Sequence, residues 1–201
     1  MECRLKLQVQ WDNELAVMNM AVSQMAGYYG IPWYGTGLVG NSHAPDYRAA
    51  LESSLTGLAA AMPGASIVTG AGRTEGIVTF SPAKLLCDCQ YIKMLKEITA
   101  PMVITEEHLA SRVIAETGPG RYFLSTGHTL RYFREQTPYE LIDHSPFEAC
   151  KENGSQDMIE RASTAALRIM AIHRSLPLDP KIEPEMKRII KAVEKAIHRD
   201  R

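Results

Sequence analysis

Three glycines and an acid lie in a short run, TGAGRTEG, that could hold a phosphate-bearing ligand. Gly70 and Gly72 have the spacing of the first two glycines in a dinucleotide-binding loop. The third glycine of that pattern should be at position 75, where this chain has Glu75, and no helix is predicted to open there. The fingerprint therefore fails, and the simpler interpretation is a tight turn after a strand. In β/α proteins, ligands still bind at such loops.

One histidine, His128, follows a glycine within the aromatic segment GRYFLSTGHTLRYFREQ. An imidazole can transfer a proton or hold a polar ligand near neutral pH. A single histidine is nevertheless more often structural than catalytic, and we predict only that it lies at a turn or a helix start. The aromatics of this segment are more often core residues than a ligand cage: Tyr122, Phe123, Tyr132 and Phe133.

Trp33 and Tyr34 are a second pair of candidates, because they follow Pro32 on a short predicted strand. The faces of aromatic rings attract cations, so these two rings could surround a quaternary ammonium group. They could equally form an ordinary wall of the fold, and the sequence does not choose between the two.

Composition excludes several classes of function. The chain has 201 residues, of which 45% are hydrophobic and 22% charged, as in an ordinary globular domain. The formal net charge is −1, and no basic patch indicates nucleic acid or a membrane surface as a partner. No apolar run is long enough to span a bilayer, and the first residues lack the apolar core of a signal peptide. We therefore expect a cytoplasmic protein.

The titratable residues show no recognisable metal or catalytic pattern. The four cysteines match no zinc-site spacing. Cys87 and Cys89 are predicted on a helix, where residues two apart point to nearly opposite sides and cannot clamp one ion. Asp88 and other acids on predicted helices are interpreted as solvated. The chain carries no Walker loop, nucleophile elbow or metalloprotease motif, so no metal site is predicted.

Strands and helices alternate over the first hundred residues. Strands are predicted at 1–9, 33–39 and 66–70, the last of them buried, and helices at 14–29, from 45–46 to 63, and from 81 onward. Ser81 is a side-chain cap followed by Pro82, a common first-turn residue. Helices dominate afterwards, and are predicted at 105–118, around 159–170 and around 186–197.

This alternation is typical of β/α units around a parallel sheet. Three or four strands are too few for a closed (β/α)₈ barrel, which needs eight strands and typically about 250 residues. A small open sheet and half of a barrel both remain possible from pattern alone. We predict one α/β domain over residues 1–201, in which 155–201 forms a helical C-terminal extension.

Three segments in order resemble the C-terminal part of the trimethylamine methyltransferase family. They are ELAVMNMAVSQMAGYYGIP, the stretch from DYRAALESSLTG to LLCDC, and the stretch from ITEEHLASRV to EACKENG. The most specific piece is IAETGPGRYFLSTGHTLRYFRE. The resemblance covers the chain from its start to about residue 180.

The resemblance implies a (β/α)₈ barrel enzyme, of which this chain would be an incomplete part with extra C-terminal helices. Such enzymes move a methyl group from a methylated amine to the cobalt of a corrinoid carried by a separate protein. Some members have pyrrolysine just after the position of Glu14, where this chain has Leu15. A leucine cannot form an adduct with an amine, so the chain resembles the non-pyrrolysine branch, whose substrates are quaternary amines such as glycine betaine.

The resemblance also implies roles for residues. His128 is expected to be catalytic, near the strand ends. Glu14, Leu15, Trp33 and Tyr34 are expected to bind the substrate, and Gly70, Gly72 and Glu75 the corrinoid. The chain departs from the family at Asn41, His43, Arg48 and Gln90, and in lacking the first half of the barrel.

Two hypotheses follow from the missing half. In the first, the chain is an enzyme, or part of one, completed by a complementing N-terminal chain. In the second, it is a catalytically inactive partial barrel that binds a partner or forms a homo-oligomer. The strand at 1–9 is expected to leave an open edge, which invites pairing.

Overall fold

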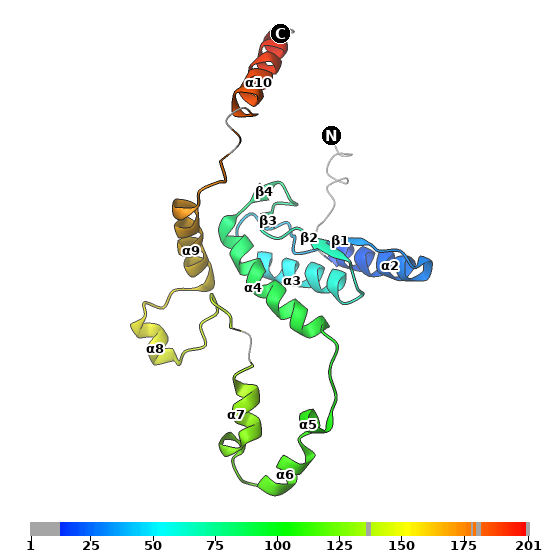
Figure 1. The fold of residues 1–201 in the computed structure, drawn as a ribbon, viewed down its shortest axis with the longest axis vertical. Helices are drawn as coiled ribbons and strands as arrows, with labels where there is room; N and C mark the ends of the chain where they lie inside the picture. The colour runs from blue at the N-terminus through cyan, green and yellow to red at the C-terminus, as the bar shows by residue number, and fades with distance from the viewer. Residues whose placement is uncertain (1–12, 136–137, 178, 180–181, 200–201) are drawn as a thin grey trace. The chain divides into compact units, whose positions relative to one another are not determined.

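The structure is a computed structural model, and it describes residues 13–135, 138–177, 179 and 182–199. The strand predicted at 1–9 lies outside these residues. The chain divides into two compact units, Met1–Leu167 and Arg168–Arg201. Figure 1 shows the order of the elements along the chain.

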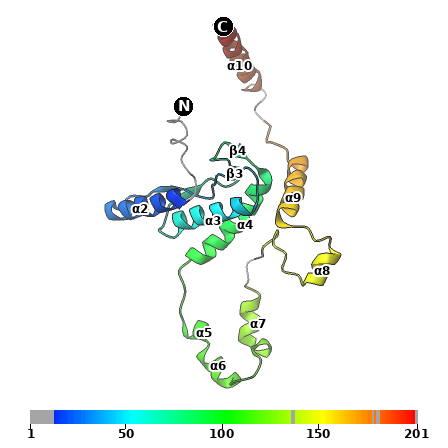
Figure 2. The same ribbon diagram turned by 180° about the vertical axis from the view of Figure 1, so that it is seen from behind.

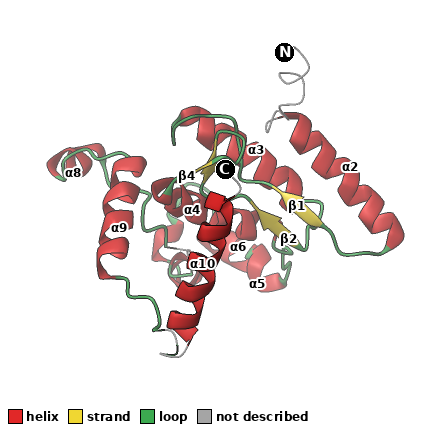
Figure 3. Ribbon diagram, turned by 90° about the horizontal axis from the view of Figure 1, so that it is seen from above, coloured by secondary structure: helices red, strands yellow, loops and turns green. Residues whose placement is uncertain are grey.

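The first unit begins with a β/α arrangement. It comprises α2 (Asn13–Tyr29), β1 (Tyr34–Thr36), α3 (Tyr47–Ala61) and β2 (Ile67–Thr69). β1 and β2 pair in parallel, with Tyr34 opposite Ile67. The helix between them, α3, packs on both strands and on α2, as Figure 3 shows. Asp46 caps α3, accepting a hydrogen bond from the Ala49 N–H at 2.8 Å.

The helix α2 packs on the rest of the unit through a small polar face. Asn19, Ser23 and Ala26 are its buried residues. The Asn19 amide donates to the Thr36 carbonyl at 2.8 Å, and the Ser23 hydroxyl to the Pro63 carbonyl at 3.0 Å. The opposite face carries exposed apolar side chains: Val17, Met18, Met25 and Tyr28. A helix that is apolar on this outward face is typical of one that is covered on both sides.

A small hairpin that the sequence analysis missed follows β2. β3 (Arg73–Thr74) and β4 (Thr79–Phe80) pair antiparallel, and α4 (Pro82–Thr99) starts directly after them. The predicted cap is confirmed, since Ser81 Oγ accepts from the Lys84 N–H at 3.2 Å. α4 packs against α3, and the two helices lie side by side in Figures 1 and 2.

Three predicted elements differ from the structure. The strand predicted at 33–39 is cut to Tyr34–Thr36, because Leu38 has a φ of 60° and cannot continue extended backbone. The strand predicted as buried exposes 57% of Ile67, because α3 covers one side of it only. The helix predicted at 105–118 is divided at Ala110, whose φ is 51°.

Short helices follow α4 in the first unit: α5 (Glu106–Leu109), α6 (Ser111–Thr117), the 3₁₀ turn η1 (Phe123–Ser125), α7 (Gly127–Phe133) and α8 (Phe147–Glu152). A longer helix, α9 (Met158–Ile172), begins in the first unit and ends in the second. The expectation that the aromatics here form a core is wrong for Tyr122, Phe123 and Phe133, which are exposed. Helices of seven residues or fewer offer too little surface to build a core between α5 and α7.

The second unit contains α10 (Ile182–Arg199), so helices close the chain as predicted. The fold is therefore helix-rich α/β, with one parallel strand pair and one hairpin among the described residues. No helix in that part of the chain is both long enough and apolar enough to cross a membrane.

Candidate active site

The loops that follow β1 and β2 meet at one edge of the parallel strand pair. Residues 37–43 follow β1, and residues 70–79 follow β2; we call them together the strand-end site. Backbone hydrogen bonds join the two loops: the Glu75 N–H donates to Ser42 O at 3.0 Å, and the Gly76 N–H to Gly40 O at 3.0 Å. The carboxyl ends of parallel strands are where α/β proteins place their ligands.

Close approach of the two loops requires glycine at position 70. Gly70 has a φ of +119°, and a Cβ there would lie 2.2 Å from Gly37 O and 2.3 Å from a Val39 methyl group. Gly72 also has a positive φ, +79°. The interpretation of this run as a tight turn after a strand is thus confirmed, and a hairpin rather than a helix opens after it.

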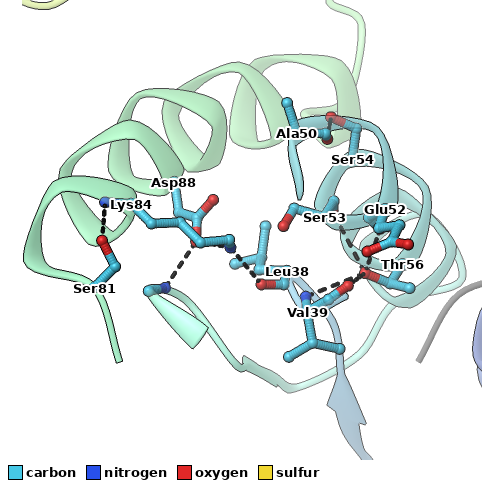
Figure 4. Close-up of polar contacts among 11 residues, drawn as sticks. Leu38, Val39, Ala50, Glu52, Ser53, Ser54, Thr56, Ser81, Lys84 and Asp88 are labelled. Atoms are coloured by element: carbon cyan, nitrogen blue, oxygen red, sulfur yellow. Dashed lines mark hydrogen bonds and ion pairs between the residues drawn. The ribbon is translucent and has the colours of Figure 1, made fainter. Parts of the chain in front are cut away.

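A buried ion pair on α4 is hydrogen-bonded to the backbone of both loops. Lys84 Nζ lies 2.6 Å from Asp88 Oδ2, and their side chains are 4% and 8% exposed. Lys84 Nζ also donates to Leu38 O at 3.1 Å, while Asp88 Oδ2 accepts from the Gly72 N–H at 2.7 Å. Figure 4 shows both side chains pointing from α4 toward Leu38. Burial raises the pKa of Asp88, and the Lys84 charge and the Gly72 N–H oppose that rise.

Two residues of α3 hold the loop after β1. Glu52 is buried and accepts hydrogen bonds from the backbone N–H groups of Asn41 at 2.7 Å and Ser42 at 3.1 Å. The Thr56 hydroxyl accepts from the Val39 N–H at 3.3 Å. These contacts satisfy backbone groups that burial would otherwise leave unpaired, which fixes the loop in one conformation.

His43 and Glu75, one from each loop, form an exposed histidine–carboxylate pair. His43 Nδ1 lies 2.8 Å from Glu75 Oε1, and the Thr79 hydroxyl donates to the other carboxylate oxygen of Glu75. Those contacts, that of Thr79 first, lower the pKa of Glu75. An ionised carboxylate only accepts, so Nδ1 carries the proton and Nε2 is available to a ligand. The His43 side chain is 82% exposed.

Strained backbone surrounds this pair. Glu75 has a φ of 51°, and Ile77 has a φ of 72°, a region that a β-branched residue rarely occupies. Such strain gathers at ligand-binding segments, where surrounding contacts enforce it. The hydrogen bonds from Glu75 and Gly76 to the loop after β1 are the contacts that do so here.

Glu14 and Leu15 lie toward the same edge. Along α2, Ser23 contacts Pro63, which precedes β2, and Asn19 contacts Thr36, the last residue of β1. The helix therefore runs antiparallel to the strands, with its first turn beyond their carboxyl ends. Four to five residues separate this turn from Asn19, which is about 6–8 Å along a helix.

The structure does not bring Trp33 and Tyr34 together. The Trp33 ring lies on the side of α3, since a Cβ at Gly35 would meet both that ring, at 3.1 Å, and Ala60. Tyr34 is exposed and its hydroxyl lies 2.6 Å from Thr69 Oγ1, on the other face of the strand pair. Of the two predicted cage residues, only Tyr34 faces away from α3. Trp33 Nε1 is buried and has no hydrogen-bond partner among the residues that the structure describes.

His128 lies at a helix start, as predicted, in the first turn of α7. Its Nε2 lies 2.9 Å from Glu107 O, and its ring centroid lies 4.6 Å from that of Tyr132. Arg131 pairs with Glu107 beside it. Within the described residues, no hydrogen bond or ring contact joins His128 to the strand-end site. Its catalytic role stays a prediction.

The sequence analysis missed His43 and was wrong about Asp88, which is buried rather than solvated. The sequence does carry a signal that Asp88 could be buried. Lys84 lies four residues before it on the same face of the helix, so the two opposite charges can pair. His43 had no local signal, because its partner Glu75 is 32 residues away. Among the described residues, no group of three or more metal-ligating side chains could hold an ion.

The hydrogen bond from the Thr79 hydroxyl is the main cause of the lowered pKa of Glu75, and substitution of Thr79 tests it. Thr79→Val should raise the pKa of Glu75 toward its ordinary range, and Thr79→Ser should leave that pKa low, as a carboxyl NMR titration would show. A depressed carboxyl pKa stabilises the fold above the pKa of the unfolded chain, and the effect is lost as pH falls through the folded value. Thr79→Val should therefore reduce the loss of stability between neutral and acidic pH. An unmoved pKa would remove the hydroxyl as its main cause.

Comparison with known proteins assigns the chain to a family. The family model described as trimethylamine methyltransferase matches residues 12–197. A trimethylamine methyltransferase of Desulfitobacterium hafniense is 34% identical over 90% of the chain, and one of Methanosarcina mazei is 31% identical over 91%. A glycine betaine methyltransferase of Desulfitobacterium hafniense is 28% identical over 88%. The chain spans only 36–37% of the length of these relatives. It belongs to the trimethylamine methyltransferase family.

Proposed function

We propose that the chain forms part of a methyltransferase that moves a methyl group from a methylated or quaternary amine to the cobalt of a corrinoid protein. The observation that carries the proposal is the strand-end site. A buried ion pair holds its two loops, and the backbone at Glu75 and Ile77 is strained. The first turn of α2 lies toward the same edge of the strand pair. In this family, such an edge is the natural place for the two substrates to meet.

The substrate we favour is a quaternary amine, because Leu15 cannot attack or trap an amine. A quaternary nitrogen is already cationic, so the electrons of the broken carbon–nitrogen bond stay on a neutral tertiary amine as it leaves. The corrinoid, as methyl acceptor, supplies the electron pair of the new carbon–cobalt bond. The protein then needs to position the ammonium group and exclude water. We therefore favour the non-pyrrolysine branch of the family for this chain.

The residue roles follow from position. The ring of Tyr34 and the carboxylate of Glu75 are the groups with which an ammonium ion would interact favourably. The Gly70 and Gly72 loop would lie beside the corrinoid, because it follows β2 at the carboxyl end of the strand pair. His128 would contact the corrinoid or orient the amine once α7 lies against this edge. His43, held by Glu75, would offer Nε2 to the polar end of the substrate.

The barrel itself must be completed for this chemistry. We infer that the chain is the C-terminal part of a (β/α)₈ barrel, and that further family sequence covers the exposed face of α2 and the free edges of β1 and β2. That sequence could be supplied by a complementing chain, while a homo-oligomer would cover the same surface. A two-stranded sheet is marginal by itself, which supports a need for more strands.

Site variants test the proposal in a reconstituted mixture. The chain would be combined with a corrinoid protein and with a polypeptide that supplies the part of the relatives' length that this chain does not span. Methylation of cob(I)alamin would then be followed spectroscopically. Glu75→Gln and His128→Ala should each lower the rate by about 10²-fold or more, on the scale of a lost positioning contact. Glu116→Gln, a change to an exposed acid on α6, is the matched control.

The alternative function, an inactive partial barrel that binds a partner, would be favoured by a specific outcome. That outcome is a stable complex with the completing polypeptide and no methylation from any quaternary amine. Unchanged rates in Glu75→Gln and His128→Ala, in an otherwise active mixture, would instead remove these residues from the site.

A further inference from the structure

The helix α3 carries an apolar stripe along its outer side. We call it the α3 stripe, and it consists of Tyr47, Leu51, Leu55, Leu58 and Met62. Four of these side chains are 43–84% exposed, and Leu58 is partly exposed. Their spacing of three or four residues places them on one side of the helix. The opposite side carries the residues that α3 buries, among them Ala49, Ser53 and Thr56.

The α3 stripe contains no charged residue. α3 has two charged residues, Arg48 and Glu52, and the Glu52 carboxylate is buried against the loop after β1. A helix on the outside of a globular fold normally carries polar and charged side chains on its outward face. A helix that is apolar on its outward face as well is typical of one that the assembled protein buries on both sides.

Completion of the barrel would leave the α3 stripe uncovered. α3 already packs against a helix on each flank, α2 and α4, and against both β1 and β2, as Figure 3 shows. Helices form the outer ring of a (β/α)₈ barrel, in which each contacts its two neighbours and the strands behind it. The stripe would therefore face outward from the finished barrel, and another molecule has to cover it.

The α3 stripe is symmetric about Leu55 to within one residue. In an antiparallel pair of α3 helices centred there, Tyr47 would lie opposite Met62 of the second copy, and Leu51 opposite Leu58 of the second copy. An aromatic ring and a methionine sulfur attract one another, and the two leucines are equal in size. A two-fold symmetric dimer uses the same surface on both copies, which this symmetry allows.

The charged residue at the border of the stripe also favours an antiparallel pair. Arg48 lies in the first turn of α3, and its side chain is 56% exposed. An antiparallel arrangement would bring it beside the last turn of α3 in the second copy, where the carbonyl groups carry partial negative charge. A parallel arrangement would instead bring the two Arg48 side chains toward one another, and like charges repel.

We propose that the outer face of α3 is a homodimer interface, in which two copies of the chain pack their α3 stripes antiparallel about Leu55. Surfaces rich in tyrosine, methionine and aliphatic groups and poor in charge are typical of contacts between identical subunits. Five side chains on one helix bury less than the about 800 Å² per partner of a standard interface, so we expect a dissociation constant of order 10⁻⁵ M. The proposal does not depend on methyl transfer.

Sedimentation velocity of the full chain over a range of concentrations measures the dimer. Leu55→Lys places two like charges opposite one another at the centre of the contact. It should weaken the dimer by about 30-fold, because the loss counts once for each copy. Met25→Lys is the matched control, since Met25 is exposed to a similar extent but lies on α2, and it should leave the dissociation constant unchanged. A chain that stays monomeric, or equal dimerisation in Leu55→Lys, would overturn the proposal.

A disulfide tests the symmetry itself and does not require Leu55→Lys to fold. Packed helices have axes about 8–10 Å apart and Cα atoms about 2.3 Å from each axis, so facing Cα atoms are about 3.5–5.5 Å apart, within disulfide reach. Leu55→Cys should therefore cross-link two copies at position 55 under mild oxidation. Peptide mapping by mass spectrometry separates this bond from those of the native cysteines. Cross-linking of Met25→Cys at position 25, with none of Leu55→Cys at position 55, would assign the contact to α2 and contradict the proposal.

Discussion

Replacing Asp88 with alanine should lower the free energy of unfolding by about 3–5 kcal/mol, as measured by urea denaturation. The substitution removes the partner of a lysine that is 4% exposed, and an uncompensated buried charge carries a penalty of this size. It also leaves the Gly72 N–H without its acceptor. The same variant should increase hydrogen exchange at Gly72, because the loop loses its support from α4.

The matched control is an exposed pair with the same spacing. Glu183 and Lys187 lie 2.6 Å apart on α10, and their side chains are more than half exposed. Glu183→Ala should change stability by less than about 1 kcal/mol, since surface pairs contribute little. If Asp88→Ala proved as mild as this control, the buried pair would not be what holds the loops.

The second large effect is expected at Gly70. Gly70→Ala should destabilise the chain by about 2–4 kcal/mol, because a Cβ would lie 2.2 Å from Gly37 O and must displace backbone. The loop after β1 would have to move away, so the contact between Glu75 and His43 should weaken as well. Thermal unfolding and an NMR titration of Glu75 would measure the two effects separately.

Gly64 separates the clash from the backbone strain. It has a φ of +92°, and a Cβ there would have nothing within 4 Å. Gly64→Ala should therefore cost about 1 kcal/mol, from the left-handed conformation alone. Equal losses at positions 64 and 70 would mean that close packing of the two loops contributes nothing.

The sequence predicted what local chemistry determines. The cap at Ser81 and the helix start at Asp46 follow from local residue types, and the periodicity of 14–29 defines α2. The turn at Gly70 and Gly72 was also predictable, since glycine is needed wherever two backbones approach closely. The parallel pairing of β1 and β2 follows from the helix that separates them in sequence.

The rest depends on contacts between distant residues. The partner of His43 is 32 residues away and the acceptor of Lys84 Nζ at Leu38 is 46 residues away, so no window of sequence could reveal either. The hairpin β3–β4 has two residues per strand, too few to produce an alternating pattern. The exposure of Tyr122 and Phe133 could not be read from their types, because aromatic residues equally suit a core or an interface.

The most direct test of the central claim is transfer of a labelled methyl group. Glycine betaine with deuterated N-methyl groups would be mixed with this chain, the completing polypeptide and a corrinoid protein held as cob(I)alamin. Mass spectrometry should then find a trideuterated methyl group on cobalt and dimethylglycine in equal amount, only when this chain is present. Cobalt methylation that is equally fast without the chain, or none with any quaternary amine, would contradict the account.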